Sequence, residues 1–479
     1  DPGEDIDSGL PVRITSIITF PMLLQHVLRI YLQQKKTVKQ HDIEKISDKD
    51  LLFIFKKFWL DEKPNEPDAK QFLELLWDVR YQFDKHVIKW VSVEEEKQHA
   101  IRRIRINYNN KQETAYLQRE TKDALPDFAL LQSMLYHSQQ MTTQYWLTPL
   151  LMFLLENQSD HTNLLYLQHL DNHLLCSRVD EPLIIRTHRF LQNLWHKETL
   201  IDAKESLGQK YENGTQYPQY WFYKLEYVLY LKLKRNNSSL VDNFRITSKN
   251  SVEHVTPQNP EQKQDEIPFE ILHNFGNLAL VTKSINSEMS NKGFSIKKVE
   301  FEHRYKGKGV SLKLEDIFAK TQWKEDEIRV HQQQMIDDFN EYMKSVSRQT
   351  EKNTVKILGQ RCAGGQNFCK GFGYAPADVA GFFVEVPHEA ADDVFCRFWL
   401  LLRQQSGYLP KGNGRAVHGL RAKQQKGKKR ADIFKAALSD FVKVITPLGA
   451  GQTFLEFLFY RTHASHEQFL HGLFSGLHS

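Results

Sequence analysis

One short segment of the chain, residues 251–298, gathers side chains that can take part in acid–base or ligand chemistry. Its notable residues, in chain order, are Glu253, His254, Pro257, Gly276, Asn277, Asn286, Asn291 and Lys292. Histidine exchanges protons near neutral pH, and carboxylate and carboxamide oxygens are ligands of hard divalent cations. The Glu-His-x-x-Pro pattern alone is a weak signal, because one histidine before a loop proline occurs by chance in many chains. The spacing of the later asparagines adds weight to it.

The residues around this pattern predict two strands and a helix. The run from Asn277 to Thr282 has the apolar character of a short strand, and Ser284 is a suitable N-cap for a helix that carries Asn286. We therefore expect a strand ending in His254, a loop, a second strand from Asn277 and a helix from about Ser284. This ββα order is the arrangement of a single-metal nuclease.

With this order, the segment resembles the His-Me finger (HNH) nuclease motif. More widely, residues 10–347 resemble the C-terminal two thirds of GmrSD-type modification-dependent (type IV) restriction proteins. The sequence GNLALVTKSINSEMSNKGFSIKK is similar to that of the family's nuclease subdomain. The stretches ITSIITFPMLLQHVLRIYL and FLELLWDVRYQFDKHVIKWV look like the helical region that precedes it. The family's N-terminal NTP-dependent domain, with its Asp-Gly-Gln-Gln-Arg type of motif, is expected to lie outside this chain, so we expect no nucleotide hydrolysis.

The resemblance implies phosphodiester hydrolysis, which needs a base to deprotonate water and a cation to stabilise charge on the phosphate. His254 is predicted to be the general base. Glu253 and Asn286 are predicted to bind one divalent cation, Mg²⁺ or Mn²⁺. Asn277 is predicted as the second catalytic-site residue, bonding across the hairpin or to the backbone near His254 and so fixing the imidazole ring.

Polar and basic residues downstream of the motif are candidates for contacts to DNA phosphates. They are Asn291, Lys292, Lys297, Arg304 and Lys306. Clusters of this kind bind phosphate in nucleic-acid-binding proteins, but charge runs are also common on ordinary solvated surfaces. Both interpretations stay open: a cluster that binds phosphate, and an ordinary solvated surface.

The rest of the chain predicts a mainly α protein. Apolar residues recur at helical spacing in residues 20–31, 72–90, 126–136, 145–156, 161–175, 184–195 and 221–234. Strand-like alternation is rare there, so residues 1–240 are expected to be an all-α array. Helical spacing returns in residues 314–318 and 323–343. The expected division is a helical region over 1–240, an HNH-like nuclease domain over 241–347 and an unassigned tail over 348–479.

The tail differs from the rest in composition. Eight of the 23 glycines lie before residue 351 and fifteen after it, and residues 411–430 are the most basic stretch of the chain. The tail also holds Cys362, Cys369 and Cys396, without the spacing of a zinc site. A genuine basic domain and a fused or frameshifted extension both remain open.

Composition limits the other classes of function. The net charge of +5 in 479 residues does not by itself indicate nucleic-acid binding. Four cysteines are too few for a disulfide framework, so a reducing compartment is expected. No window reaches the 18 or so apolar residues of a membrane span, and the best, residues 145–155, contains Thr148 and Pro149.

The resulting prediction is a metal-dependent DNA endonuclease of the restriction or phage-defence type, in the cytoplasm of a prokaryote. The resemblance implies double-stranded DNA as the substrate, with modified bases as one alternative. RNA stays open as a substrate, as do homo-oligomerisation and activity without the N-terminal domain. The alternative from another class is a helical scaffold that binds nucleic acid or a protein through a catalytically inactive hairpin.

Overall fold

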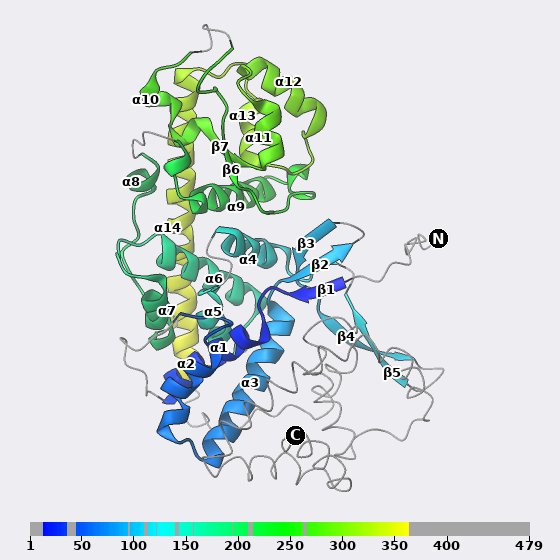
Figure 1. The fold of residues 1–479 in the computed structure, drawn as a ribbon, viewed down its shortest axis with the longest axis vertical. Helices are drawn as coiled ribbons and strands as arrows, with labels where there is room; N and C mark the ends of the chain where they lie inside the picture. Colours follow the sequence, from blue (N-terminus) through cyan, green and yellow to red (C-terminus); the bar gives the residue numbers. More distant parts are fainter. Residues whose placement is uncertain are drawn as a thin grey trace, which may run out of the picture.

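The computed structural model describes residues 13–363, apart from 36–44, 94–95, 110–113, 121, 139–142, 157, 194, 209–213 and 262–265. Within these ranges the chain is mostly helical and has small sheets (Figure 1). The basic stretch 411–430 and the cysteines Cys369 and Cys396 lie outside the described residues. The side chain of Cys362 is not described either.

The N-terminal part of the described chain is a body of packed helices. They are α1 (Phe20–Lys35), α2 (Leu51–Phe58), α3 (Glu66–His86), α4 (Pro126–Ser138), α5 (Leu147–Leu154), α6 (Asp160–Leu175), α7 (Leu183–Gln192), α8 (Ala203–Leu207) and α9 (Gln219–Arg235). Short 3-10 turns are η2 (Leu60–Glu62), η3 (Gly214–Gln216) and η4 (Ser239–Val241). Each helix predicted from the apolar spacing has a counterpart here.

Helix α3 shows how the local sequence sets a helix boundary. Asn65 accepts a hydrogen bond from the backbone N–H of Asp68, at 2.9 Å, and the Asp68 carboxylate accepts one from the N–H of Asn65, at 3.3 Å. This reciprocal capping satisfies two N–H groups that have no partner inside the helix. At the other end, the Lys89 ammonium donates to the carbonyls of Phe83, Asp84 and Val87. The helix therefore ends at His86.

The expectation of an all-α region before residue 240 is wrong, because the described part of this region contains five strands. Strands β1 (Arg13–Ser16), β2 (Lys89–Val93) and β3 (Glu96–Ala100) form an antiparallel sheet in the order β1-β2-β3. Strands β4 (Ile104–Asn109) and β5 (Thr114–Arg119) form a separate hairpin. Trp90 continues the apolar rhythm of α3 in sequence, but it lies in β2, paired with Thr15 and His99.

Residues after 250 build a second, smaller group of elements on their own apolar core. These elements are β6 (Ser251–His254), α10 (Phe269–Leu272), η6 (Phe275–Asn277), β7 (Leu278–Val281), α11 (Lys283–Met289), α12 (Phe294–Arg304) and α13 (Leu312–Phe318). The core includes Val255, Val281, Phe301, Phe318 and Trp323, all buried. The helical spacing predicted at residues 314–318 corresponds to α13.

Helix α14 (Glu325–Ala363) joins the two groups. It runs along the length of the molecule in Figure 1, beside α10 and α8 toward one end and beside α6 toward the other. It packs against α6, α8, α9 and η6. It also continues past residue 348, where the sequence places the start of the tail. One helix therefore contacts both the helical body and the strands around His254.

The described ranges contain no helix with the length and apolar character needed to cross a membrane.

The helical body buries some charged groups as pairs. Lys224 of α9 and Asp171 of α6 are both fully buried and form an ion pair, and Tyr220 donates to the same carboxylate at 3.0 Å. Each charge in this contact has a partner, as burial in a low-dielectric interior requires.

Several histidines before residue 200 are buried or half-buried, and this burial lowers their pKa. The pKa falls to about 3 for His26, His86, His99 and His169. It falls to about 4 for His137 and His173. Desolvation of the imidazolium is the largest cause in each case, because a charged ring loses its hydration when it is buried. These side chains are neutral at pH 7 in the folded protein.

We expect acid to destabilise the protein well above the range in which carboxylates titrate. Between pH 6.5 and about 3, unfolded histidines bind protons that these folded ones do not, so the free energy of unfolding falls as the pH is lowered. A histidine such as His26 contributes a loss of up to about 2 kcal/mol between about pH 7 and about pH 5. Urea unfolding of His26→Gln should show a correspondingly smaller pH dependence. An unchanged pH dependence in His26→Gln would contradict the account.

Candidate active site

Strands β6 and β7 bring the two halves of the predicted motif together. They pair antiparallel, with His254 opposite Leu278 and Ser251 opposite Val281. Helix α11 follows β7 directly and packs beside β6. The elements thus occur in the predicted order of strand, loop, strand and helix. The predicted N-cap is wrong: the hydroxyl of Thr282 accepts from the N–H of Ile285 at 3.4 Å, and Ser284 lies inside the helix.

Asn277 ties the loop between the strands together. Its side chain is fully buried. Its amide oxygen accepts from the N–H of Thr256 at 2.9 Å and from the indole N–H of Trp323 at 3.1 Å. Its amide nitrogen donates to the carbonyls of Thr256 and Leu272, at 3.1 and 2.9 Å. The expected bonds to the backbone near His254 are therefore present, and they hold the chain two residues after it.

His254 ends β6 with its ring in a nearly closed environment. The residue is 8% exposed, and its Nε2 lies 3.0 Å from Nδ1 of His273 and 3.3 Å from the side-chain amide of Gln258. A Cβ atom at residue 214 would lie 2.9 Å from this Nε2, so only glycine leaves room for the ring. Burial, His273 and Lys297, in this order, lower the pKa of His254 to about 3. The imidazole is neutral at pH 7.

His273 is a site residue that the motif does not include. It lies just after α10, is buried, and has its pKa lowered by desolvation. The backbone N–H of Gly214 donates to its Nδ1 at 3.2 Å, and the exposed ring of Phe269 packs edge-on against it. One signal in the sequence points to it, since it is the only histidine between His254 and His303.

Glu253 and Lys297 are paired with each other. The Lys297 ammonium lies 2.5 Å from the Glu253 carboxylate and donates to the carbonyl of His254 at 2.7 Å. Both residues are buried, and Lys297 is fully so. Burial raises the pKa of Glu253 and lowers that of Lys297, while their mutual attraction opposes both shifts. Lys297 thus fastens α12 to the end of β6 and presents no ammonium to the surface.

The predicted cation ligands do not form a ready site in this arrangement. A divalent cation at Glu253 would have to share the carboxylate with the buried ammonium of Lys297, and like charges this close repel strongly. Asn286 lies half-buried on α11. Across the described residues, no group of three or more His, Cys, Asp or Glu side chains could hold a metal ion. Glu253 and Asn286 as placed do not fit a divalent cation.

The other predicted phosphate contacts lie on α12 and in the turns on either side of it. Asn291 is exposed, whereas the Lys292 ammonium is bound by both carboxylate oxygens of Glu300, at 2.7 and 2.9 Å. Arg304 and Lys306 are exposed, and each forms an ion pair with a glutamate, Glu288 and Glu302 respectively. Exposed pairs of this kind are weak and exchange readily with another anion.

Helix α14 holds the residue before Asn277. The N–H of Gly276 donates to the side chain of Gln332 at 2.5 Å, and its carbonyl lies 3.0 Å from Nδ1 of His331. A Cβ atom at residue 276 would lie 2.6 Å from the carbonyl oxygen of Ile328. Glycine is required here by the close approach of two backbones.

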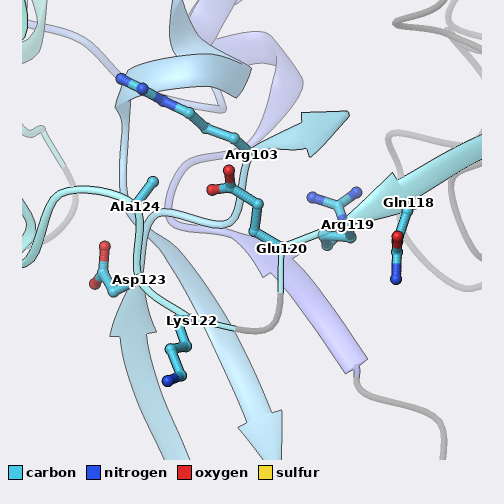
Figure 2. Close-up of a pocket in the computed structure, with 7 residues that line it drawn as sticks. All are labelled: Arg103, Gln118, Arg119, Glu120, Lys122, Asp123 and Ala124. Atoms are coloured by element: carbon cyan, nitrogen blue, oxygen red, sulfur yellow. The ribbon is translucent and has the colours of Figure 1, made fainter. Parts of the chain in front are cut away.

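A separate hollow of about 490 Å³ lies at the base of the β4–β5 hairpin (Figure 2). Its lining mixes basic and acidic side chains, among them Arg119, Lys122, Glu120 and Asp123, and includes no histidine. Arg103 points away from the hollow in Figure 2, and its guanidinium contacts Asp160 at 2.8 and 3.2 Å. Its lining offers no candidate general base of the kind seen at His254, so the chemistry is better placed at β6.

The comparison with protein families agrees with this location. Residues 203–338 match the family model for the C-terminal domain of GmrSD restriction endonucleases. The matched GmrSD-like stretch runs from α8 into α14 and contains His254, His273 and Asn277. The helical body before residue 203 lies outside the match. No curated protein and no solved structure was found to match the chain.

We expect Lys297→Met to destabilise the protein by about 3–5 kcal/mol, because it leaves the buried carboxylate of Glu253 without a counter-charge. Chemical denaturation measures this loss. The double variant Glu253→Met/Lys297→Met should recover most of it, since no charge is then left unpaired. The neighbouring Lys298, whose ammonium is exposed and donates to the Lys320 carbonyl, is the matched control, and its replacement by Met should cost less than about 1 kcal/mol. A stable Lys297→Met protein that binds DNA more weakly would instead identify Lys297 as a phosphate contact.

Proposed function

We propose that this chain provides the nuclease part of a restriction-type DNA endonuclease, which hydrolyses phosphodiester bonds with His254 as the general base. The observation that carries the proposal is the position of His254. It ends β6 opposite β7 and lies inside the stretch similar to the C-terminal domain of GmrSD restriction endonucleases. The order of β6, β7 and α11, which is that of ββα nucleases, supports the same conclusion.

His254 has the chemistry that this role requires. Hydrolysis needs a group that takes a proton from the attacking water. The ring is neutral at pH 7, because burial above all lowers its pKa to about 3, so it has a lone pair to accept that proton. In the free protein such a ring is a weak base. A substrate phosphate beside it raises the pKa, because nearby negative charge favours the imidazolium.

A requirement for one divalent cation, Mg²⁺ or Mn²⁺, remains a prediction of this proposal. When bound, such a cation would stabilise the negative charge that develops on the phosphate. As placed, the two predicted ligands do not form a ready cation site, because Glu253 is held by Lys297. The Asn286 side chain, which has no hydrogen bond or ion pair among the described residues, is the one left to contact such a cation. The proton transfer to His254 does not itself involve the cation.

DNA is the proposed substrate, and the exposed side chains of Asn291, Arg304 and Lys306 are the proposed phosphate contacts. The two basic residues have glutamate partners that a DNA phosphate could replace. Modified bases as the target and a homo-oligomeric assembly stay predictions as well. So does the phage-defence setting.

One observation favours a second candidate function. The Glu253–Lys297 pair occupies a carboxylate that the resemblance assigns to cation binding. A protein that keeps this fold for structural reasons and binds nucleic acid or a protein partner without cleaving it would show the same pair. The two candidates differ in whether His254 is needed for cleavage.

The test is plasmid cleavage by the purified chain, and by the intact protein if this chain is a piece of it, with Mg²⁺ or Mn²⁺. We expect His254→Ala to lower the rate at least about 100-fold, because removal of a general base typically costs this much. EDTA should abolish cleavage if the cation is required. The exposed His303→Ala is the matched control and should cleave like the unchanged protein.

Equal cleavage by the His254→Ala and unchanged proteins would overturn the proposal for His254. DNA binding without cleavage by the intact protein would favour the scaffold. The same assay on RNA decides between the two nucleic acids. Cleavage of RNA in preference to plasmid would contradict the proposed substrate.

A further inference from the structure

The contact between His254 and His273 also bears on which ring nitrogens carry hydrogen. The two imidazoles meet edge to face, at an interplanar angle of 81°, with His254 Nε2 only 3.0 Å from His273 Nδ1. At this distance one nitrogen must carry a hydrogen and the other a lone pair, because two lone pairs or two N–H groups facing each other repel. Either ring could be the donor on this contact alone.

The backbone of Gly214 fixes which ring donates. Its N–H points at the same Nδ1 of His273, at 3.2 Å. A backbone N–H can only donate, so Nδ1 of His273 must be the acceptor and the hydrogen of a neutral His273 lies on its Nε2. His254 is then the donor, through Nε2–H. Glycine at position 214 makes the approach possible, because a Cβ there would lie 2.9 Å from His254 Nε2.

Gln258 does not compete with this assignment. Its side-chain amide nitrogen, as placed, also lies 3.3 Å from His254 Nε2. An amide can turn by 180° and present its oxygen to an N–H, whereas the backbone N–H of Gly214 has no such freedom. The fixed donor therefore decides the hydrogen positions, and the Gln258 amide, once turned, offers its oxygen as a second acceptor.

From these contacts we infer that His273 is a positioning residue that holds His254 as the Nε2-protonated tautomer, leaving Nδ1 of His254 as the nitrogen that accepts the proton from water. The inference rests on the proposed function for its catalytic consequence, but the tautomer itself does not. Nδ1 of His254 has no hydrogen-bond partner among the described residues. It is also not among the unpartnered atoms there that are closed off from solvent. It is therefore the ring nitrogen that a water molecule can reach.

The proton transfer balances within this arrangement. Nδ1 of His254 takes one proton from the attacking water, whose oxygen forms the new bond to phosphorus. The P–O bond to the leaving oxygen breaks, and that oxygen departs with the electron pair and takes a proton from solvent. The ring becomes an imidazolium with N–H groups on both nitrogens, and its Nε2–H stays bonded to His273. A neutral acceptor at this position steadies the ring in both states without placing a second charge beside it.

The tautomer is tested first, without DNA. In the protein labelled with ¹⁵N-histidine, two-bond ¹H–¹⁵N correlation spectra distinguish the tautomers, with His254→Asn and His273→Asn used for assignment. We expect His254 to be protonated on Nε2. Protonation on Nδ1 would overturn the inference, whether or not the protein cleaves DNA.

The positioning role is tested by kinetics of two variants at His273. His273→Ala removes the acceptor, and we expect kcat to fall about tenfold to a hundredfold, with KM for plasmid changed less than about twofold. His273→Asn places an amide oxygen where Nδ1 lies, and it should restore kcat to within about fivefold of the unchanged protein. Thermal denaturation checks that both variants are folded.

Equal losses of kcat in the Ala and Asn variants, both folded, would overturn the positioning role. A failure of the proposed function itself looks different, because His254→Ala would then cleave like the unchanged protein while the tautomer measurement still gave an answer.

Discussion

The contact between Gly276 and helix α14 is the constraint on which the site depends. The backbone of Gly276 lies so close to the helix that a single added methyl group would meet the carbonyl oxygen of Ile328 at 2.6 Å. Both of its polar backbone groups find partners on the helix, Gln332 for the N–H and His331 for the carbonyl. The close approach that glycine permits and these two hydrogen bonds together fix Gly276 on α14.

The contact at Gly276 helps to position His254. Asn277 follows Gly276 directly, and two of its four side-chain hydrogen bonds fix the backbone of Thr256, while the other two reach Leu272 and Trp323. Thr256 lies two residues after His254, whose strand is fastened from the other side by the buried pair of Glu253 and Lys297. The position of His254 thus depends on the buried contacts of Asn277, Glu253 and Lys297.

The same helix also binds the helical body. Asn340 contacts Asp202 and the N–H of Ala203, and Asp338 forms an ion pair with Lys232 of α9. Any movement of the body against α14 therefore acts on the helix to which Gly276 is fixed. Both α8 and η6, which contact α14, lie within the matched stretch, residues 203–338.

Local patterns in the sequence predict much of this structure, and long-range contacts account for what they miss. The apolar spacing predicts helices such as α1, α6 and α9, because one face of each helix is buried. Trp90 misleads, because it keeps the helical rhythm although α3 ends four residues before it, at His86. Lys297 is taken for a surface charge because nothing in the local sequence reveals that it meets Glu253, 44 residues away. His273 is missed for the same reason, since Gly214 and His254 meet it only in the folded chain.

The most direct test of this account is the protection of the Thr256 amide in Gly276→Ala, measured by hydrogen exchange together with plasmid cleavage. The added Cβ must push the loop away from α14, so we predict that the Thr256 amide loses protection and cleavage slows, while amides of α6 keep theirs. Unchanged protection of Thr256, with normal cleavage, would contradict the claim that α14 positions His254 through Gly276 and Asn277.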